Sequence, residues 1–137
     1  IRTELADGRE SREAWLEGFD AVLCDVPCSG LGIIRKKPDV RYKNPVQLAE
    51  LPRVQRAILD NASRYVRPGG VLLYATCTIL PEENEGVISA FLDRRDDFCR
   101  ESFSLPGFTE KNDGSLTLWP QRHGTDGFYV CKMRKKC

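Results

Sequence analysis

The sequence predicts an α/β fold built on a largely parallel sheet, and three patterns carry that prediction. Phe19–Val26 and Val71–Ala75 are continuous apolar runs, which is typical of parallel strands that are buried on both faces. Between them, apolar residues recur at helical spacing from Leu51 to Val66. Near the end of the chain, Gly127–Met133 alternates in polarity and predicts a final edge strand. Strands that alternate with helices along a chain indicate the α/β class.

Local signals predict where these elements begin and end. Ile1–Leu5 is interpreted as the tail of a strand. Pro52 suits the first turn of the long helix, and Arg67–Gly70 is expected to end that helix. A second helix is expected to open at Pro81–Glu85, where acidic side chains favour the positive end of the helix dipole. The segment Asp97–Gly114 is expected to hold a strand and a loop.

Composition indicates one soluble domain with reduced cysteines. The chain has 137 residues, a net charge of +1 and 41% hydrophobic residues, and no run has the length of a membrane span. Six cysteines allow a disulfide framework, but no secretory signal accompanies them. No Cys-x-x-Cys pair occurs and His123 is the only histidine, so no metal site is expected. We therefore expect a cytoplasmic protein, and the opening Ile1 suggests a piece of a longer chain.

Two cysteines follow the two apolar runs. Cys28 lies just past the first run, near Asp25, and Cys77 lies just past the second. If both runs are parallel strands of one sheet, both thiols emerge at the carboxyl edge, where open α/β sheets bind ligands. A thiolate adds to electron-poor carbons, and a nearby carboxylate can hold a polar ligand edge. The alternatives are inert core thiols and a redox-active Cys28–Cys77 pair.

A basic segment follows the first cysteine. It contains a single acid, Asp39, one aromatic residue, Tyr42, and five bases: Arg35, Lys36, Lys37, Arg41 and Lys43. Such a cluster is either a solvated face or a contact surface for the phosphates of RNA. Charge alone leaves these two readings open.

The motifs around both cysteines resemble those of the RNA cytosine-5 methyltransferases of the Sun/Nop2/RsmB type. The first motif includes Asp25–Gly30 with Arg35, and the second runs from Gly69 to Thr78 and on to Asn84. The closing Arg122–Tyr129 resembles the last motif of that family. The likeness covers nearly the whole chain and is greatest to bacterial enzymes that act on small-subunit ribosomal RNA.

This resemblance implies a reaction and a role for each residue. The family methylates C5 of cytosine with S-adenosylmethionine through a covalent adduct at C6. By resemblance, Cys77 is the nucleophile, Cys28 assists release of the product, and Asp25 contacts the N3/N4 edge of the cytosine. The backbone at Pro27 helps to hold the exocyclic amine. The five bases then become RNA contacts, with ribosomal RNA as the expected partner and no membrane involved.

The resemblance also implies an incomplete cofactor site. Asp7 resembles the acid that contacts the adenine end of S-adenosylmethionine, together with Asp25 and Pro27. The glycine-rich cofactor loop of the family has no counterpart in this sequence. We therefore expect residues 1–137 to be the C-terminal part of a Rossmann-like, class I methyltransferase domain, with its N-terminal strands missing and a final antiparallel strand. Such a fragment is expected to be inactive alone and prone to self-association. The alternative is a non-catalytic RNA-binding or scaffold module that retains the fold.

Overall fold

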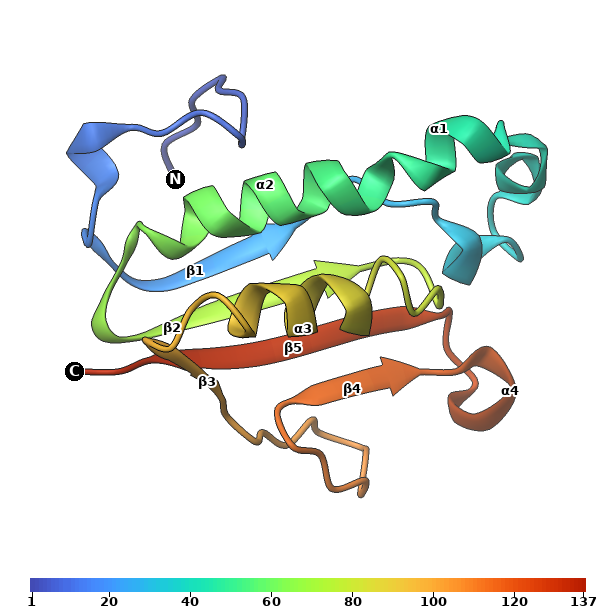
Figure 1. The fold of residues 1–137 in the computed structure, drawn as a ribbon. Coiled ribbons are helices and arrows are strands. Elements are labelled where there is room, and N and C mark those ends of the chain that lie inside the picture. The colour runs from blue at the N-terminus through green and yellow to red at the C-terminus, as the bar shows by residue number, and fades with distance from the viewer.

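A computed structural model describes all 137 residues and contains one five-stranded sheet (Figure 1). Its strands are β1 (Phe19–Asp25), β2 (Val66–Thr76), β3 (Phe98–Arg100), β4 (Ser115–Leu118) and β5 (Phe128–Lys135). The order is β1-β2-β5-β3, and β4 also pairs with β5. β1 runs parallel to β2, whereas β2, β3 and β4 are all antiparallel to β5. Only β5 therefore runs against the other strands, which confirms a largely parallel α/β sheet.

Two helices cover one face of the sheet (Figure 1). They are α2 (Leu51–Ser63) and α3 (Glu85–Leu92), and both bury apolar side chains against the strands. The short helices are α1 (Pro45–Ala49) and α4 (Pro120–His123), with 3-10 turns at Glu13–Trp15, Leu31–Ile33 and Pro38–Tyr42. Fully buried residues of the core include Leu59, Leu72, Tyr74, Phe91 and Met133. None of the helices has the length and apolar character that a membrane span requires.

The long helix ends earlier than the sequence predicts. It stops at Ser63, and Val66 already belongs to β2. The expected stop signal, Arg67–Gly70, lies inside the strand instead. Phe19 pairs with Val66 and Ala21 pairs with Val71, so residues 67–70 bulge out of the ladder. Pro68 has no N–H to donate, and Gly69 has a φ of 74°, which explains why this segment interrupts the pairing.

The last strand lies in the interior of the sheet and not at its edge. β5 pairs with β2 on one side and with β3 and β4 on the other. Its alternating sequence reflects two different faces, because Tyr129, Cys131 and Met133 are buried while the residues between them are partly exposed. An interior strand also alternates in polarity when helices cover only one face of its sheet, because its other face meets solvent. The alternating pattern therefore does not identify an edge strand here.

The N-terminal segment is also different from the prediction. Ile1–Leu5 forms no strand, and both Ile1 and Leu5 are exposed. The expected strand within Asp97–Gly114 is the short β3, followed by a loop that leads into β4. α3 begins at Glu85, because Pro81–Asn84 forms a turn in front of it.

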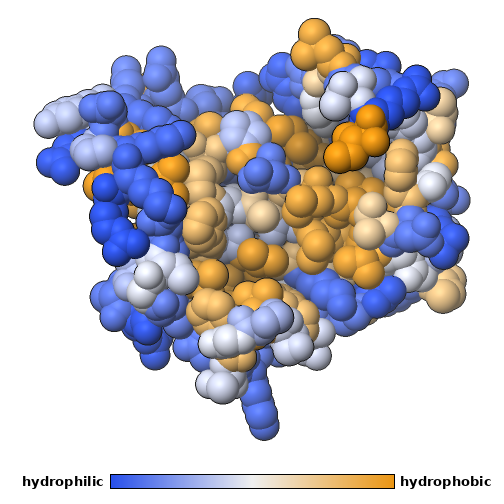
Figure 2. Space-filling view, turned by 180° about the vertical axis from the view of Figure 1, so that it is seen from behind, coloured by the Kyte–Doolittle hydropathy of each residue, from blue (hydrophilic) through white to orange (hydrophobic).

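The opposite face of the sheet carries no helix. Figure 2, seen from behind, shows apolar side chains gathered over the middle of this side. On β1, Leu23 is 65% exposed and Phe19 is 42% exposed. An open apolar face of this kind is the physical basis for the predicted self-association, which stays a prediction.

Candidate active site

The two candidate cysteines meet at the carboxyl edge of the parallel strand pair. Asp25, the last residue of β1, pairs with Ala75 of β2, so both strands end at the same level. Cys77 directly follows β2 and Cys28 lies three residues beyond β1. Their Sγ atoms are 3.1 Å apart, and both cysteines are free thiols. The structure thus brings together the pair that the sequence suggested.

The six cysteines have different environments. Cys28 and Cys77 are half-buried, Cys24 and Cys131 are buried, and Cys99 and Cys137 are exposed. Burial and the contact with Cys77 raise the pKa of Cys28, so this thiol keeps its proton at neutral pH. Burial likewise raises the pKa of Cys24 and Cys131. Cys24 and Cys131 are therefore inert core thiols.

A buried carboxylate holds the Cys28 loop in place. Glu83 is 1% exposed, and its Oε2 accepts hydrogen bonds from Ser29 N and Gln55 Nε2, each at 2.8 Å. Gln55 Nε2 also donates to the carbonyl of Pro27 at 2.9 Å. The Tyr74 hydroxyl donates to the main-chain oxygen of Glu83 at 2.6 Å. The sequence predicted only that Glu83 is an acid near the start of a helix. It did not indicate that Glu83 holds the Cys28 loop, because an acid at this position is expected in either case.

The Cys77 loop is held by polar side chains on either side of the cysteine. Thr76 Oγ1 donates to Asn84 Oδ1 at 2.6 Å, and Asn84 Nδ2 donates to the Thr78 carbonyl at 3.0 Å. Thr78 Oγ1 and Ser29 Oγ lie 2.7 Å apart and connect this loop to the Cys28 loop. All four residues are buried. The two cysteines therefore sit on loops that are fixed to each other.

Two glycines bring a third segment to the same place. Gly32 N donates to the Cys77 carbonyl at 3.0 Å, and Gly127 N donates to the Gly32 carbonyl at 2.8 Å. A Cβ on Gly32 would lie 2.9 Å from the Cys77 oxygen, and one on Gly127 would lie 2.8 Å from the Gly32 Cα. Side chains are therefore excluded at both positions. This close approach explains why the last sequence motif carries a glycine at position 127.

The basic segment is only partly free to meet a ligand. Asp126 is buried, and its carboxylate pairs with Lys36 at 2.5 Å and with Arg35 at 3.6 Å. Lys43 Nζ donates to the Ser29 carbonyl at 2.8 Å. Lys37 and Arg41 have no carboxylate partner, and the Arg41 guanidinium lies over the ring of the exposed Tyr42. No local pattern in the sequence indicates that Asp126 competes for two of these cations.

Two of the three candidate cofactor residues share a small cavity. The cavity has a volume of about 230 Å³, and Asp7 and Asp25 both line it. Arg9 is bonded to Asp7 and holds the pKa of that carboxyl down at about 2, so Asp7 is ionised and already paired. Pro27 lies outside the cavity, with its carbonyl engaged by Gln55. The cavity is smaller than the 300–1,000 Å³ typical of cofactor pockets, so the donor set fits only part of S-adenosylmethionine. No three His, Cys, Asp or Glu side chains come together as a metal-binding group.

Fold and site together define part of a Rossmann-like, class I methyltransferase fold, with ligand-facing loops at the carboxyl edge of its parallel strands. The family model for the 16S rRNA methyltransferase RsmB/F matches residues 1–134, and the chain belongs to that family.

Individual relatives and solved structures agree with this assignment. The chain is 42% identical, over 99% of its length, to the probable ribosomal RNA small subunit methyltransferase B of Bacillus subtilis, and spans 32% of that protein. The crystal structure of PH0851 superposes on 93% of this chain and 29% of its own, with a TM-score of 0.84 and 37% identity. NSun6 from Pyrococcus horikoshii, solved with SFG, superposes on 82% of this chain and 29% of its own, with a TM-score of 0.67 and 33% identity. The chain thus spans about a third of its curated relatives.

Proposed function

We propose that the protein containing this chain transfers a methyl group from S-adenosylmethionine to C5 of a cytosine in RNA, through a covalent adduct between Cys77 and C6. The observation that carries the proposal is the pair of free thiols, 3.1 Å apart, at the carboxyl edge of β1 and β2. The family match and a relative named as a ribosomal RNA small subunit methyltransferase support ribosomal RNA as the substrate. A neighbour solved with SFG, an analogue of S-adenosylmethionine, supports the cofactor.

The proposed chemistry begins with the thiolate of Cys77. Its sulfur forms a bond to C6, and the electron pair of the C5–C6 double bond moves toward C5 as N3 takes a proton. Asp25 is exposed at the end of β1, where its carboxylate holds the N3/N4 edge and stabilises the protonated ring. C5 then accepts the methyl group that S-adenosylmethionine supplies when bound. Water at this open edge takes the C5 proton, and the electron pair of that C–H bond re-forms the C5–C6 double bond. The C6–S bond breaks with its electron pair leaving on the Cys77 sulfur, and N3 gives up the proton that it took.

The environment of Cys28 suits the release step. Its pKa is raised by burial and by the contact with Cys77, so it remains a neutral thiol beside the adduct. A neutral thiol at 3.1 Å can donate a hydrogen bond to the departing Cys77 sulfur, which stabilises the thiolate as the C6–S bond breaks. Asp7, Asp25 and the backbone of Pro27 are the residues proposed to hold the cofactor and the cytosine amine.

The RNA strand is proposed to cross the basic segment. Lys37 and Arg41 are exposed and lack a carboxylate partner, so they are the strongest phosphate contacts. Arg35 and Lys36 are 67% and 70% exposed at their side chains despite the contact with Asp126, and they add to the same field. Lys43 is engaged with the Ser29 carbonyl and acts mainly through its charge. We also propose that the protein acts in the cytoplasm.

A second function, a non-catalytic RNA-binding module, is favoured for this chain alone by one observation. The cavity beside Asp7 and Asp25 has only about 230 Å³. Because the chain spans 32% of a matched relative, we propose that residues 1–137 are the C-terminal part of a longer catalytic domain that completes this site. Calorimetry of this chain with S-adenosylmethionine tests whether its cofactor site is complete. If the site is incomplete, as we propose, this chain does not bind S-adenosylmethionine tightly. Tight binding by this chain would contradict the incomplete site.

Methyl transfer by the full-length enzyme tests the proposal. Cys77→Ala is expected to abolish both methylation and the covalent RNA adduct, which is seen as a band that resists denaturation. Cys28→Ala is expected to accumulate the adduct, because release is slowed. Cys99→Ala is the matched control, since Cys99 is an exposed thiol on β3, away from this edge. Full activity of Cys77→Ala would contradict the assignment.

A further inference from the structure

A second, larger cavity lies beside the Cys77 loop and has no part in the chemistry above. Its volume is about 530 Å³, within the range of small-molecule and nucleotide sites. The segment from β4 to α4 supplies one side, with Trp119 between the two elements and Arg122 on α4. The turn before α3 supplies another side, with Asn84. β4 runs in the direction of β2, so α4 follows it at the same edge of the sheet as the cysteines.

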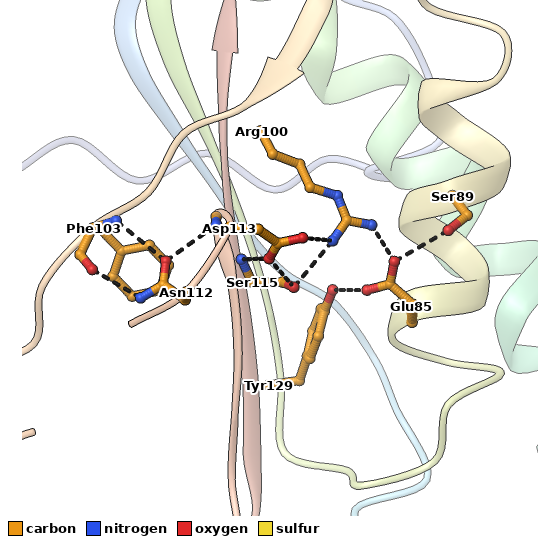
Figure 3. Close-up of polar contacts among 9 residues, drawn as sticks. Glu85, Ser89, Arg100, Phe103, Asn112, Asp113, Ser115 and Tyr129 are labelled. Atoms are coloured by element: carbon orange, nitrogen blue, oxygen red, sulfur yellow. Dashed lines mark hydrogen bonds and ion pairs between the residues drawn. The ribbon is translucent and has the colours of Figure 1, made fainter. Parts of the chain in front are cut away.

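Three residues that line the cavity belong to one polar network (Figure 3): Glu85, Ser115 and Tyr129. Glu85 accepts hydrogen bonds from Arg100, from the Tyr129 hydroxyl at 3.0 Å and from Ser89 at 3.1 Å. Arg100 also contacts Asp113 at 3.2 Å and Ser115 at 3.1 Å. Side chains from α3, β3, β4 and β5 therefore meet in one network. A site whose lining side chains are already held by hydrogen bonds needs little reorganisation to bind.

Two cations at this cavity have no carboxylate partner. The cavity is lined by four charged residues besides His123: Glu85, Glu110, Lys111 and Arg122. Glu85 is paired with Arg100. His123 accepts a hydrogen bond from Trp119 N at Nδ1 and donates from Nε2 to Glu110 at 2.9 Å, so Glu110 keeps its negative charge. Lys111 and Arg122 are exposed and have no carboxylate partner. Half-buried Trp119 lines the cavity and is not stacked on another aromatic ring. Two free cations beside an open indole favour a ligand with an anionic group and a planar ring.

The cavity is physically connected to the nucleophile. Asn84 lines it and also bonds the side chain of Thr76 and the carbonyl of Thr78, on either side of Cys77. The chain beyond α4 also leads from the cavity to the basic segment. Asp126, three residues after the end of α4, forms ion pairs with Arg35 and Lys36. A strand of RNA that crosses the basic segment to reach Cys77 would therefore continue into this cavity.

We propose that this cavity binds a nucleotide of the RNA strand adjoining the target cytosine, with its base against Trp119 and its phosphate between Lys111 and Arg122. The proposal rests on the proposed function for its substrate class. It adds a second contact on the RNA, so that recognition includes a neighbour of the reacting base. Asn84 is then a positioning residue that links occupation of the cavity to the Cys77 loop.

Tryptophan fluorescence can report on this site alone. The chain has two tryptophans, so Trp15→Phe leaves Trp119 as the only one, while the substituted phenyl ring still packs on Phe19 and Tyr65. In this background the full chain is titrated with a short, labelled single-stranded RNA containing one cytosine. Label anisotropy measures total binding, and Trp119 emission measures occupation of the cavity. Cytidine monophosphate, titrated in parallel, is expected to quench Trp119 far less at equal concentration.

The expected result is quenching of Trp119 that follows the anisotropy curve. Trp119→Ala should weaken RNA binding about fivefold to a hundredfold, the effect of losing one base–aromatic stack, and Trp119→Phe should recover part of it. Arg122→Ala and Lys111→Ala should each lower the slope of log affinity against log salt by about 0.7. Arg64→Ala, an exposed arginine beyond the opposite end of α2, is the control and should leave the slope unchanged.

Failure of this proposal is distinguishable from failure of the proposed function. If RNA raises the anisotropy but leaves Trp119 emission unchanged, and the cavity variants behave like Arg64→Ala, the cavity proposal is wrong and the proposed function stands. If cytidine monophosphate quenches Trp119 as strongly as the RNA does, the cavity is a site for free nucleotides and the proposal is wrong. If RNA changes neither signal, both the RNA contacts of the proposed function and this proposal are contradicted.

Discussion

The Glu83→Ala substitution tests whether one buried carboxylate holds the Cys28 loop. Ser29 N is fully buried, and its only hydrogen bond is to Glu83 Oε2 at 2.8 Å. An orphaned buried donor costs about 1–3 kcal/mol. The substitution also removes the 2.8 Å hydrogen bond from Gln55 Nε2 to Glu83, and this loss adds about 1 kcal/mol to the destabilisation. The bond from Gln55 Nε2 to the Pro27 carbonyl remains. Removal of Glu83 Oε1, a buried atom without a donor, offsets part of this. We expect a net destabilisation of about 2 kcal/mol.

Urea unfolding of the full chain measures this loss, and the midpoint should fall while the slope with urea stays constant. Glu82→Ala is the matched control, because Glu82 is the exposed neighbour of Glu83 and its removal should change the free energy of unfolding by less than about 0.5 kcal/mol. Hydrogen exchange supplies a local readout, since the Ser29 amide should lose its protection in Glu83→Ala alone. If Glu83→Ala unfolds like Glu82→Ala and the Ser29 amide stays protected, the network does not hold the loop.

Three further predictions concern the same edge of the sheet. Gly32→Ala should destabilise the fold by about 1–3 kcal/mol, because its Cβ would press on backbone atoms of Gly127 and Cys77. Gly86→Ala is the control and should be neutral in the same unfolding assay. If the two variants were equally stable, the close approach at Gly32 would be contradicted. Burial raises the pKa of Glu85, but hydrogen bonds from Arg100 and Tyr129 outweigh it and leave this pKa below its ordinary value of 4.5. The stabilisation is therefore complete above about pH 4.5 and is lost as the pH falls through the lower folded-state pKa, so the gap in unfolding free energy between wild type and Glu85→Gln should narrow in acid; a constant gap would refute the pairing. Cys28 should react with iodoacetamide more slowly than Cys137 at neutral pH in mass-spectrometric mapping, because its raised pKa keeps it protonated; equal rates would contradict this.

Sequence patterns predicted the parts of the fold that depend on local chemistry. The parallel pair β1 and β2 is confirmed, because continuous apolar runs are typical of parallel strands. α2 and α3 are confirmed because their apolar spacing matches the face that packs on the sheet. The meeting of Cys28 and Cys77 followed from topology, since parallel neighbours end at one edge.

Features that depend on distant partners were not predictable. The interior position of β5 depends on β3 and β4 pairing with its outer edge, and no local pattern encodes that choice. The early end of α2 depends on a bulge at residues 67–70, which uses the same proline and glycines that commonly stop a helix. Glu83 and Asp126 are acids whose burial arises only when loops from three parts of the chain converge.

The most direct test of the central claim is to identify which cysteine carries the adduct. RNA with 5-fluorocytidine at the target should trap the adduct in the full-length enzyme, because fluorine cannot leave C5 as the proton does. Trypsin leaves Cys77 in Tyr65–Arg94 and Cys28 in Glu13–Arg35, so mass spectrometry separates them. We predict the RNA mass on Tyr65–Arg94, in wild type and in Cys28→Ala, and no adduct in Cys77→Ala. An adduct on Glu13–Arg35 would contradict the assignment of Cys77 as the nucleophile.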